Sequence, residues 1–270
     1  MKIIGFIAFL IGIILTAISL LGQFTDLGNY KSVAPRSWEK FDIDLIQSLD
    51  SYDSILAYAN KHFSQKQFSK KEKMIFLYNT IINRFTHENA EHNIFSNWIL
   101  FFLANINSTF RHIWDPELMV SKGWSLHCDQ SSYLLLRLAM DHGIRGRHVG
   151  LYGHVVMEAW YNSAWHLFDP DLEVVPINKK GHILSVRSLI KNDHLLQKYY
   201  EPYHAVDLFK TIENNTYMSY PQGARFEWKS NVLVYNEKFM EILKFVIPMI
   251  LLGFGLYITR KQSSNKTLFI

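Results

Sequence analysis

Two long apolar runs lie near the two ends of the chain. Residues 3–22 carry no charged side chain and are about long enough to cross the hydrocarbon core of a bilayer. Residues 245–259 are also uncharged, and Ile242, Leu243 and Lys244 precede them, with a lysine that can extend its ammonium group toward the membrane surface. We expect both runs to be membrane-spanning helices. A buried core helix is the alternative for either run.

Basic residues flank the two runs on their outer sides. Lys2 precedes the first run, and Arg260 and Lys261 follow the second. Because cytoplasmic flanks are enriched in Lys and Arg, we expect both termini in the cytoplasm and the residues between the spans outside it. No convincing small-x-small cleavage site precedes Gln23, so we expect a retained anchor rather than a cleaved signal peptide. The expected organisation is an N-terminal anchor (1–22), a helical part (23–109), a core with a C-terminal extension (110–240), a second span (241–259) and a basic tail (260–270).

Helical periodicity dominates the first half of the segment between the spans. Ser69, with Glu72 three residues later, has the pattern of a capping box and predicts a helix over 69–87. The apolar face of the 69–87 helix consists of Met74, Leu77, Ile81 and Ile82. A third apolar run, at 93–107, favours a buried helix.

The pattern changes after residue 130. The run from Ser131 to Asp141 is apolar nearly all round, which predicts a helix buried inside the domain, and Gly143 is a natural residue to end it. Short segments rich in valine and aromatic residues follow, and residues 161–164 (YNSA) have the composition of a hairpin turn. Residues 185–200 again favour a helix. Helices followed by an antiparallel meander indicate the α+β fold class.

Composition narrows the function classes. The 28 lysine and arginine residues exceed the 24 aspartate and glutamate residues by only four, and the basic residues are scattered, so we expect no nucleic-acid partner. The chain has one cysteine, Cys128, which rules out a disulfide within the chain. Cys128 is therefore a buried filler, a free thiol or a nucleophile.

The surroundings of Cys128 favour the nucleophile. A helix N-terminus and an adjacent imidazole both favour the thiolate form of a cysteine, and Cys128 lies where the buried helix should begin. His154 opens one expected strand and Asp169 ends the next. The two strands should be antiparallel, so we expect His154 and Asp169 to be cross-strand neighbours close to that helix N-terminus.

Other residues compete for these roles. His127, His142, His148 and His166 are rival bases, and Asp171 is a rival carboxylate that we interpret as a turn residue. No pair among the histidines and Cys128 has the close spacing typical of a structural zinc site, so we expect no metal and no cofactor. Two further residues could contact an anionic ligand, although we favour a solvated strand edge for them: Arg145 and Arg147.

These residues together resemble the core of the transglutaminase-like superfamily. The resemblance covers roughly residues 110–175 and rests on the order and spacing of several short motifs. The motifs are a loop with Gly123, Cys128, an apolar helix to Met140, the run Gly143-Ile144-Arg145-Gly146-Arg147, Gly153-His154, and the run Trp165-His166-Leu167-Phe168-Asp169-Pro170.

The resemblance implies a papain-like fold and a Cys-His-Asp triad that works through a thioester. Cys128 would be the nucleophile, His154 the general base and acid, and Asp169 the residue that orients His154. The backbone N–H of Cys128 would be one oxyanion donor. Two residues depart from the family pattern. His127 stands where a small or apolar residue is expected, and Asp129 places a carboxylate beside the thiolate, which disfavours the thiolate. A second oxyanion donor would come from Trp98, Trp114 or Trp124.

The sequence thus predicts a membrane-anchored cysteine acyltransferase or amidohydrolase of bacterial type. Its substrate would be a peptide, a protein or an amino-modified glycan of the cell envelope, at the membrane surface. Two alternatives stay open. One is a catalytically inactive transglutaminase-like scaffold in a membrane assembly, and the other is a cell-wall cysteine peptidase.

Overall fold

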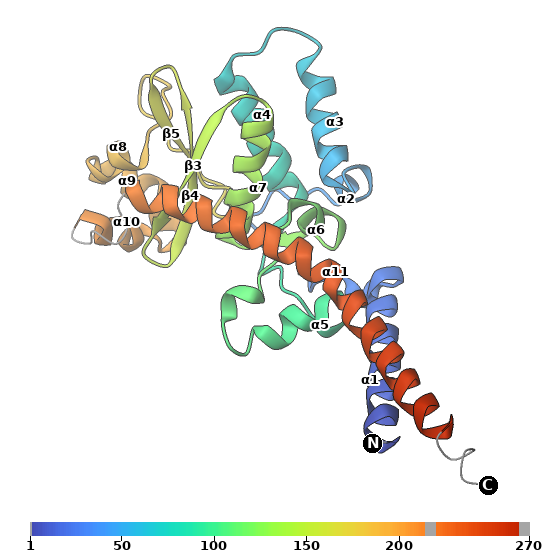
Figure 1. Ribbon diagram of the computed structural model, residues 1–270. Coiled ribbons are helices and arrows are strands. Elements are labelled where there is room, and N and C mark those ends of the chain that lie inside the picture. The colour runs from blue at the N-terminus through green and yellow to red at the C-terminus, as the bar shows by residue number, and fades with distance from the viewer. Residues whose placement is uncertain (1, 214–219, 265–270) are drawn as a thin grey trace. The chain divides into compact units, whose positions relative to one another are not determined.

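The computed structural model describes residues 2–213 and 220–264 and has a mixed α+β fold (Figure 1). The chain divides into two compact units. The first unit consists of Met1–Tyr30, Glu91–Ile113 and Leu233–Ile270, and the second of Lys31–Ala90 and Trp114–Val232.

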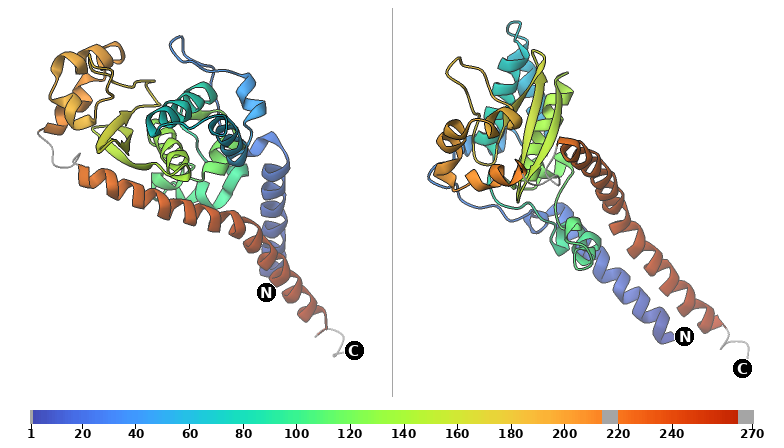
Figure 2. Two further views of the ribbon diagram at one scale, coloured as in Figure 1. Left: turned by 90° about the horizontal axis from the view of Figure 1, so that it is seen from above. Right: turned by 90° about the vertical axis from the view of Figure 1, so that its left-hand side faces the viewer.

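The first unit contains the two apolar helices expected from the sequence. Within α1 (Lys2–Phe24) and α11 (Tyr220–Ser264), the segments Ile3–Phe24 and Val232–Lys261 are long and apolar enough to cross a membrane, by length and composition. The second segment is longer than expected because the helix continues through Pro248. Figure 2 shows α1 beside the final part of α11. The smaller elements are η1 (Asp26–Gly28), α5 (Ile94–Leu103) and η2 (Ser108–Phe110).

The expected buried helix at 93–107 is only partly buried. α5 has a kink where Asn97 leaves the helical region, with φ −155° and ψ 95°. Leu100 is buried, whereas Phe102 is 53% exposed. The prediction of a buried helix was therefore wrong for the side of α5 that carries Phe102. The helix packs on α1, and apart from Leu100 its apolar side chains are half-buried or, at Phe102, exposed.

Small residues bring α1 and α11 together. A Cβ added at Gly255 would lie 2.7 Å from the carbonyl oxygen of Gly5 and 2.7 Å from the Cβ of Phe9. A Cβ added at Gly12 would lie 2.9 Å from the side chain of Leu252. Glycine at these positions lets the two helix backbones approach closely, which is how helices pack in membranes.

We expect Gly255→Leu to lower the thermal stability of the detergent-solubilised protein, because the added side chain meets the backbone of α1. Overpacking of this kind costs roughly 1–3 kcal/mol and lowers the unfolding midpoint by a few degrees. Gly253→Leu is the matched control, since no described atom lies within 4 Å of the Cβ it would add. Tryptophan fluorescence during heating measures both midpoints. Equal shifts in the two variants would contradict the contact.

The second unit begins with the helices α2 (Asp44–Ser48), α3 (Tyr52–Phe63) and α4 (Lys70–Arg84). The predicted capping box is confirmed, because Ser69 accepts a hydrogen bond from the backbone N–H of Glu72, and the Glu72 carboxylate accepts one from the N–H of Ser69. The helices α6 (Pro116–Ser121) and α7 (Cys128–Asp141) follow. α7 is buried as expected, with leucines 134, 135, 136 and 138 fully inside.

An antiparallel sheet carries the second half of this unit. Its strands β3 (Arg145–Leu151), β4 (His154–Tyr161) and β5 (Ala164–Phe168) lie in the order β3-β4-β5. The predicted hairpin turn is confirmed, with Asn162 and Ser163 at φ 49° and 60°, in the left-handed region that a two-residue turn of this kind uses. A separate parallel pair joins β1 (Thr86–His87) to β2 (Ser125–Leu126).

Helices pack on both faces of the sheet (Figures 1 and 2). α7 covers one face, where Leu136 and Met157 leave room only for a glycine at position 146. Val156 and Leu167 belong to the core on the other face. The helix expected over 185–200 is divided by Asn192, whose side chain caps a new helix. The elements on this face are α8 (Val186–Ile190), α9 (Asp193–Tyr200), η3 (Glu201–Tyr203) and α10 (Val206–Glu213).

Candidate active site

Cys128 is the first residue of α7, as the position of the thiol in the sequence predicted. The short strand β2 and His127 lead into it. Gln130 fixes this entry, because its Oε1 accepts hydrogen bonds from the backbone N–H of His127 (3.2 Å) and of Ala90 (3.0 Å), and its Nε2 donates to the carbonyl of Ala90 (2.8 Å). The backbone N–H of Cys128 belongs to the first turn of the helix, where N–H groups have no partner within the helix.

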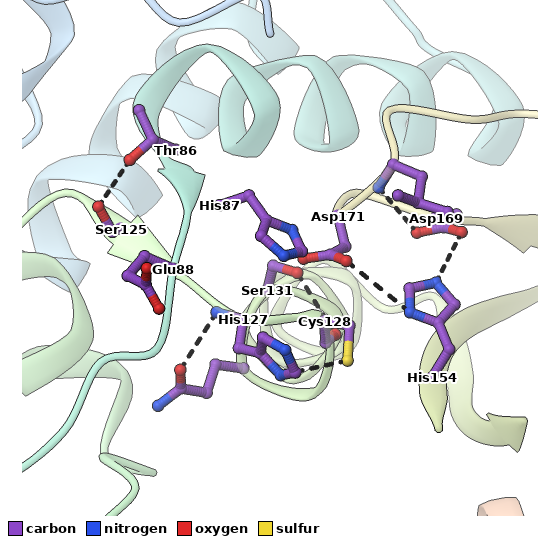
Figure 3. Close-up of polar contacts among 12 residues, drawn as sticks. Thr86, His87, Glu88, Ser125, His127, Cys128, Ser131, His154, Asp169 and Asp171 are labelled. Atoms are coloured by element: carbon purple, nitrogen blue, oxygen red, sulfur yellow. Dashed lines mark hydrogen bonds and ion pairs between the residues drawn. The ribbon is translucent and has the colours of Figure 1, made fainter. Parts of the chain in front are cut away.

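His154 and Asp169 lie together, as expected. The Nε2 of His154 is 2.9 Å from Oδ2 of Asp169, and both side chains are buried. They are not directly opposite in the ladder, because the pairing of β4 with β5 ends at Met157 and Phe168 and Asp169 follows that pair. Figure 3 shows His154 with Asp169 on one side and with Cys128 and Asp171 on the other.

The thiol lies close to two histidines. Cys128 Sγ, a ring nitrogen of His154 and a carboxylate oxygen of Asp171 all lie within 4.8 Å of one another. Sγ is also 3.3 Å from Nδ1 of His127, which in turn is 3.6 Å from Oδ1 of Asp129. His127 is one of the two residues that depart from the family pattern, and it contacts the thiol directly.

The charges around the thiol favour protonated imidazoles. Burial lowers the pKa of His154, but the charge and hydrogen bond of Asp169, with a contribution from Cys128, outweigh burial and hold that pKa well above its usual range. The hydrogen bond with Asp129, followed by that with Cys128, raises the pKa of His127 to about 10. Two imidazolium groups beside one sulfur would both stabilise a thiolate.

Asp171 and His87 belong to the site, and sequence reasoning did not place them there. Asp171 does lie in a turn, as expected, but it is buried, with Oδ2 3.8 Å from Nδ1 of His154. Its other oxygen forms an ion-pair contact with Nδ1 of His87 on β1. The spacing Asp169-x-Asp171 at the end of a strand could have predicted that Asp171 lies near Asp169. No pattern in the sequence around His87 could have predicted its position in the site.

Three of the four rival histidines have other contacts. Nδ1 of His142 contacts the carbonyl of Leu138 at 2.7 Å, and His166 contacts the carbonyls of Ile183 and Tyr161. His148 packs against the ring of Tyr133, and burial lowers its pKa to about 4.

The three tryptophans considered as oxyanion donors differ in their surroundings. The indole N–H of Trp98 donates to the carbonyl of Lys244, and that of Trp124 donates to the carbonyl of Val33. Trp114 is buried against the edge of Tyr133. The indoles of Trp98 and Trp124 thus already have carbonyl acceptors.

The site is nearly closed. Cys128 is 4% exposed and His154 6% exposed. A neighbouring cavity of about 10 Å³, lined in part by His87, Ser131 and Asp171, has room for about one water molecule. A molecule larger than water could therefore reach Sγ only after the side chains that cover the thiol move.

The arrangement has the parts of a nucleophilic site: a thiol at a helix N-terminus, a histidine beside it and a buried carboxylate on that histidine. No known family model, curated protein or solved structure matches this chain.

Proposed function

We propose that this chain is a membrane-anchored, transglutaminase-like cysteine enzyme that transfers or hydrolyses acyl groups. One observation carries the proposal. His154 lies between the only thiol of the chain and a buried carboxylate, with its Nε2 2.9 Å from Asp169 and its other side facing Cys128. A helix packed on an antiparallel sheet, with the cysteine at the helix start, is also the arrangement that a papain-like core would require.

The chemistry follows from these positions. Cys128 Sγ attacks the carbonyl carbon of an amide, and the carbonyl oxygen takes the electron pair while the backbone N–H of Cys128 stabilises it. His154 then gives its proton to the departing nitrogen, which leaves as ammonia or an amine, and a thioester remains on Sγ. Water or a primary amine, deprotonated by His154, attacks the thioester and regenerates the thiol.

Asp169 has an orienting role in this scheme. Its hydrogen bond to Nε2 fixes the ring so that Nδ1 faces the sulfur, and its charge stabilises the imidazolium. The two apolar helices would anchor the enzyme, with both termini in the cytoplasm and the catalytic unit outside. That topology supports an envelope peptide, protein or amino-modified glycan as substrate.

A labelled amine tests the proposal. Purified protein in detergent is incubated with an envelope fraction and a biotinylated primary amine, and both covalently attached biotin and released ammonia are measured. We expect wild-type protein to release ammonia when a carboxamide forms the thioester, or to attach biotin when the labelled amine attacks that thioester. Cys128→Ala should do neither. Equal signals in the two proteins, including no signal from either, would contradict acyl transfer.

A non-catalytic scaffold is the second candidate, favoured by the 4% exposure of Cys128. In that case the buried thiol fills the core and the unit acts by binding. Cells that carry Cys128→Ala would then keep the wild-type phenotype, whereas an enzyme predicts that they show the phenotype of a deletion.

A further inference from the structure

Asp171 is the buried acidic group that the acyl-transfer scheme leaves without a task. It comes from the turn after β5, His154 comes from the start of β4 and Cys128 from the start of α7. All three are nine-tenths or more buried, and one ligand atom from each lies within 4.8 Å of the others. Three separate elements thus deliver a sulfur, a nitrogen and an oxygen to one small volume.

This donor set suits zinc. Zn²⁺ binds thiolate, imidazole and carboxylate ligands, and tetrahedral coordination places such ligand atoms about 3.3–3.6 Å apart. The Nδ1 of His154 and Oδ2 of Asp171 are 3.8 Å apart, so a contraction of a few tenths of an ångström would bring them to zinc-binding separation. Calcium and magnesium prefer oxygen ligands and would gain little from the sulfur.

The contacts of His154 and Asp171 with their other neighbours also favour a zinc site. A metal-binding histidine usually gives its second ring N–H to a carboxylate, and a metal-binding carboxylate is itself held by a neighbour. His154 has Asp169 on Nε2 at 2.9 Å, which leaves Nδ1 for a metal. The second oxygen of Asp171 contacts His87.

A second group of potential ligands exists beside the first. His127, Cys128 and Asp129 also bring three ligand atoms within 4.8 Å of one another. His127 and Asp129 are neighbours of Cys128 in sequence and are half-buried, whereas His154 and Asp171 are buried. The buried set has the orienting hydrogen bonds described above, so it is the better candidate.

We propose that Cys128, His154 and Asp171 bind Zn²⁺, with a fourth position left for water, and that the bound ion blocks the thiol. The bond from sulfur to zinc replaces the pairing of Sγ with His154, and the proton shared by that pair is released to solvent. Binding needs only the three ligands. Its inhibitory consequence rests on the function proposed above.

Zinc titration of the purified protein tests the binding. We expect Zn²⁺, measured against a chromophoric chelator, to bind wild-type protein with one equivalent, and Asp171→Asn to weaken binding at least tenfold. Asp129→Asn is the matched control and should bind as the wild type does. The proposal is overturned if Asp129→Asn loses zinc while Asp171→Asn keeps it, or if wild-type protein binds no zinc.

Two measurements keep the test decisive if Asp171→Asn does not fold. Co²⁺ added to wild-type protein should give the intense near-ultraviolet absorption of a thiolate–Co²⁺ bond, and Zn²⁺ should abolish it. Zn²⁺ should also protect Cys128 from iodoacetamide, EDTA should restore labelling, and Mg²⁺ should not protect. Labelling unaffected by Zn²⁺ would contradict the metal site, whereas the labelling rate without metal reports on the catalytic proposal alone.

Discussion

Replacing His154 with alanine should slow the alkylation of Cys128 by iodoacetamide at pH 5 by about tenfold. In the wild-type protein the imidazole lies beside the thiol, and Asp169 raises the pKa of His154 despite its burial. An imidazolium at pH 5 would hold the sulfur as a thiolate, which is the reactive form. Without the ring, the thiol loses its counter-charge on that side.

The expected size follows from the thiolate population. An ordinary thiol with a pKa of about 8.5 is only about 0.03% thiolate at pH 5. A thiolate held by an ion pair is nearly fully populated, although its intrinsic nucleophilicity is lower, with a Brønsted coefficient of about 0.4–0.5. The population gain of about three and a half decades exceeds the loss of about two decades, and because His127 retains part of that gain in the variant, about a tenfold advantage is expected.

The rates are measured by intact-mass spectrometry, and the single thiol gives one product. His142→Ala is the matched control, because His142 contacts the carbonyl of Leu138, and it should label as the wild type does. Unchanged labelling in His154→Ala would remove His154 from the base role. If labelling then fell in His127→Ala, the imidazole 3.3 Å from Sγ would be the one that activates the thiol.

Local patterns were enough to predict the elements that carry the proposed triad. The apolar run after residue 130 predicted a buried helix, and the helix begins at Cys128, where the Gln130 side chain accepts a hydrogen bond from the backbone N–H of His127. Asn162 and Ser163 supplied the turn that makes β4 and β5 antiparallel. Once the helix and the hairpin are in place, the proximity of His154 and Asp169 follows from the length of the strands.

Contacts between distant segments could not be predicted in this way. His87 reaches Asp171 because β1 pairs with β2 in parallel, and a two-residue strand has no periodicity to detect. The expectation of no metal rested on sequence spacing, and close spacing is only one way to bring ligands together. The division into two units also depends on packing, because residues 91–113 join the apolar helices rather than their sequence neighbours.

The same dependence on distant contacts makes Arg84 the residue whose loss should destabilise the second unit most. Arg84 ends α4 and is 1% exposed. Its guanidinium donates to the carbonyls of Leu49 (3.0 Å), Val120 (2.9 Å) and Gly123 (3.3 Å). The planar guanidinium group, a fork of several N–H donors, therefore joins the segment before α3 to the loop that leads to Cys128.

Arg84→Met should cost roughly 3–5 kcal/mol of unfolding free energy, since three backbone carbonyls lose a charged hydrogen-bond donor. Methionine keeps much of the apolar stem but leaves three carbonyls without this donor, and each buried unsatisfied group costs about 1–3 kcal/mol. The unfolding midpoint should fall by roughly 10 °C.

Arg36→Met, at an exposed arginine near Trp38, is the control and should shift the midpoint by no more than about a degree.

Arg84→Lys tests the geometry of the guanidinium donors. An ammonium group keeps the charge but cannot reproduce the planar geometry of three donors, so this variant should lie between the wild type and Arg84→Met. Because Val120 and Gly123 precede the nucleophile, the lysine variant should also label Cys128 at an altered rate while still folded. A midpoint for Arg84→Met within a degree or two of the wild type would show that the loop before Cys128 is held by other contacts.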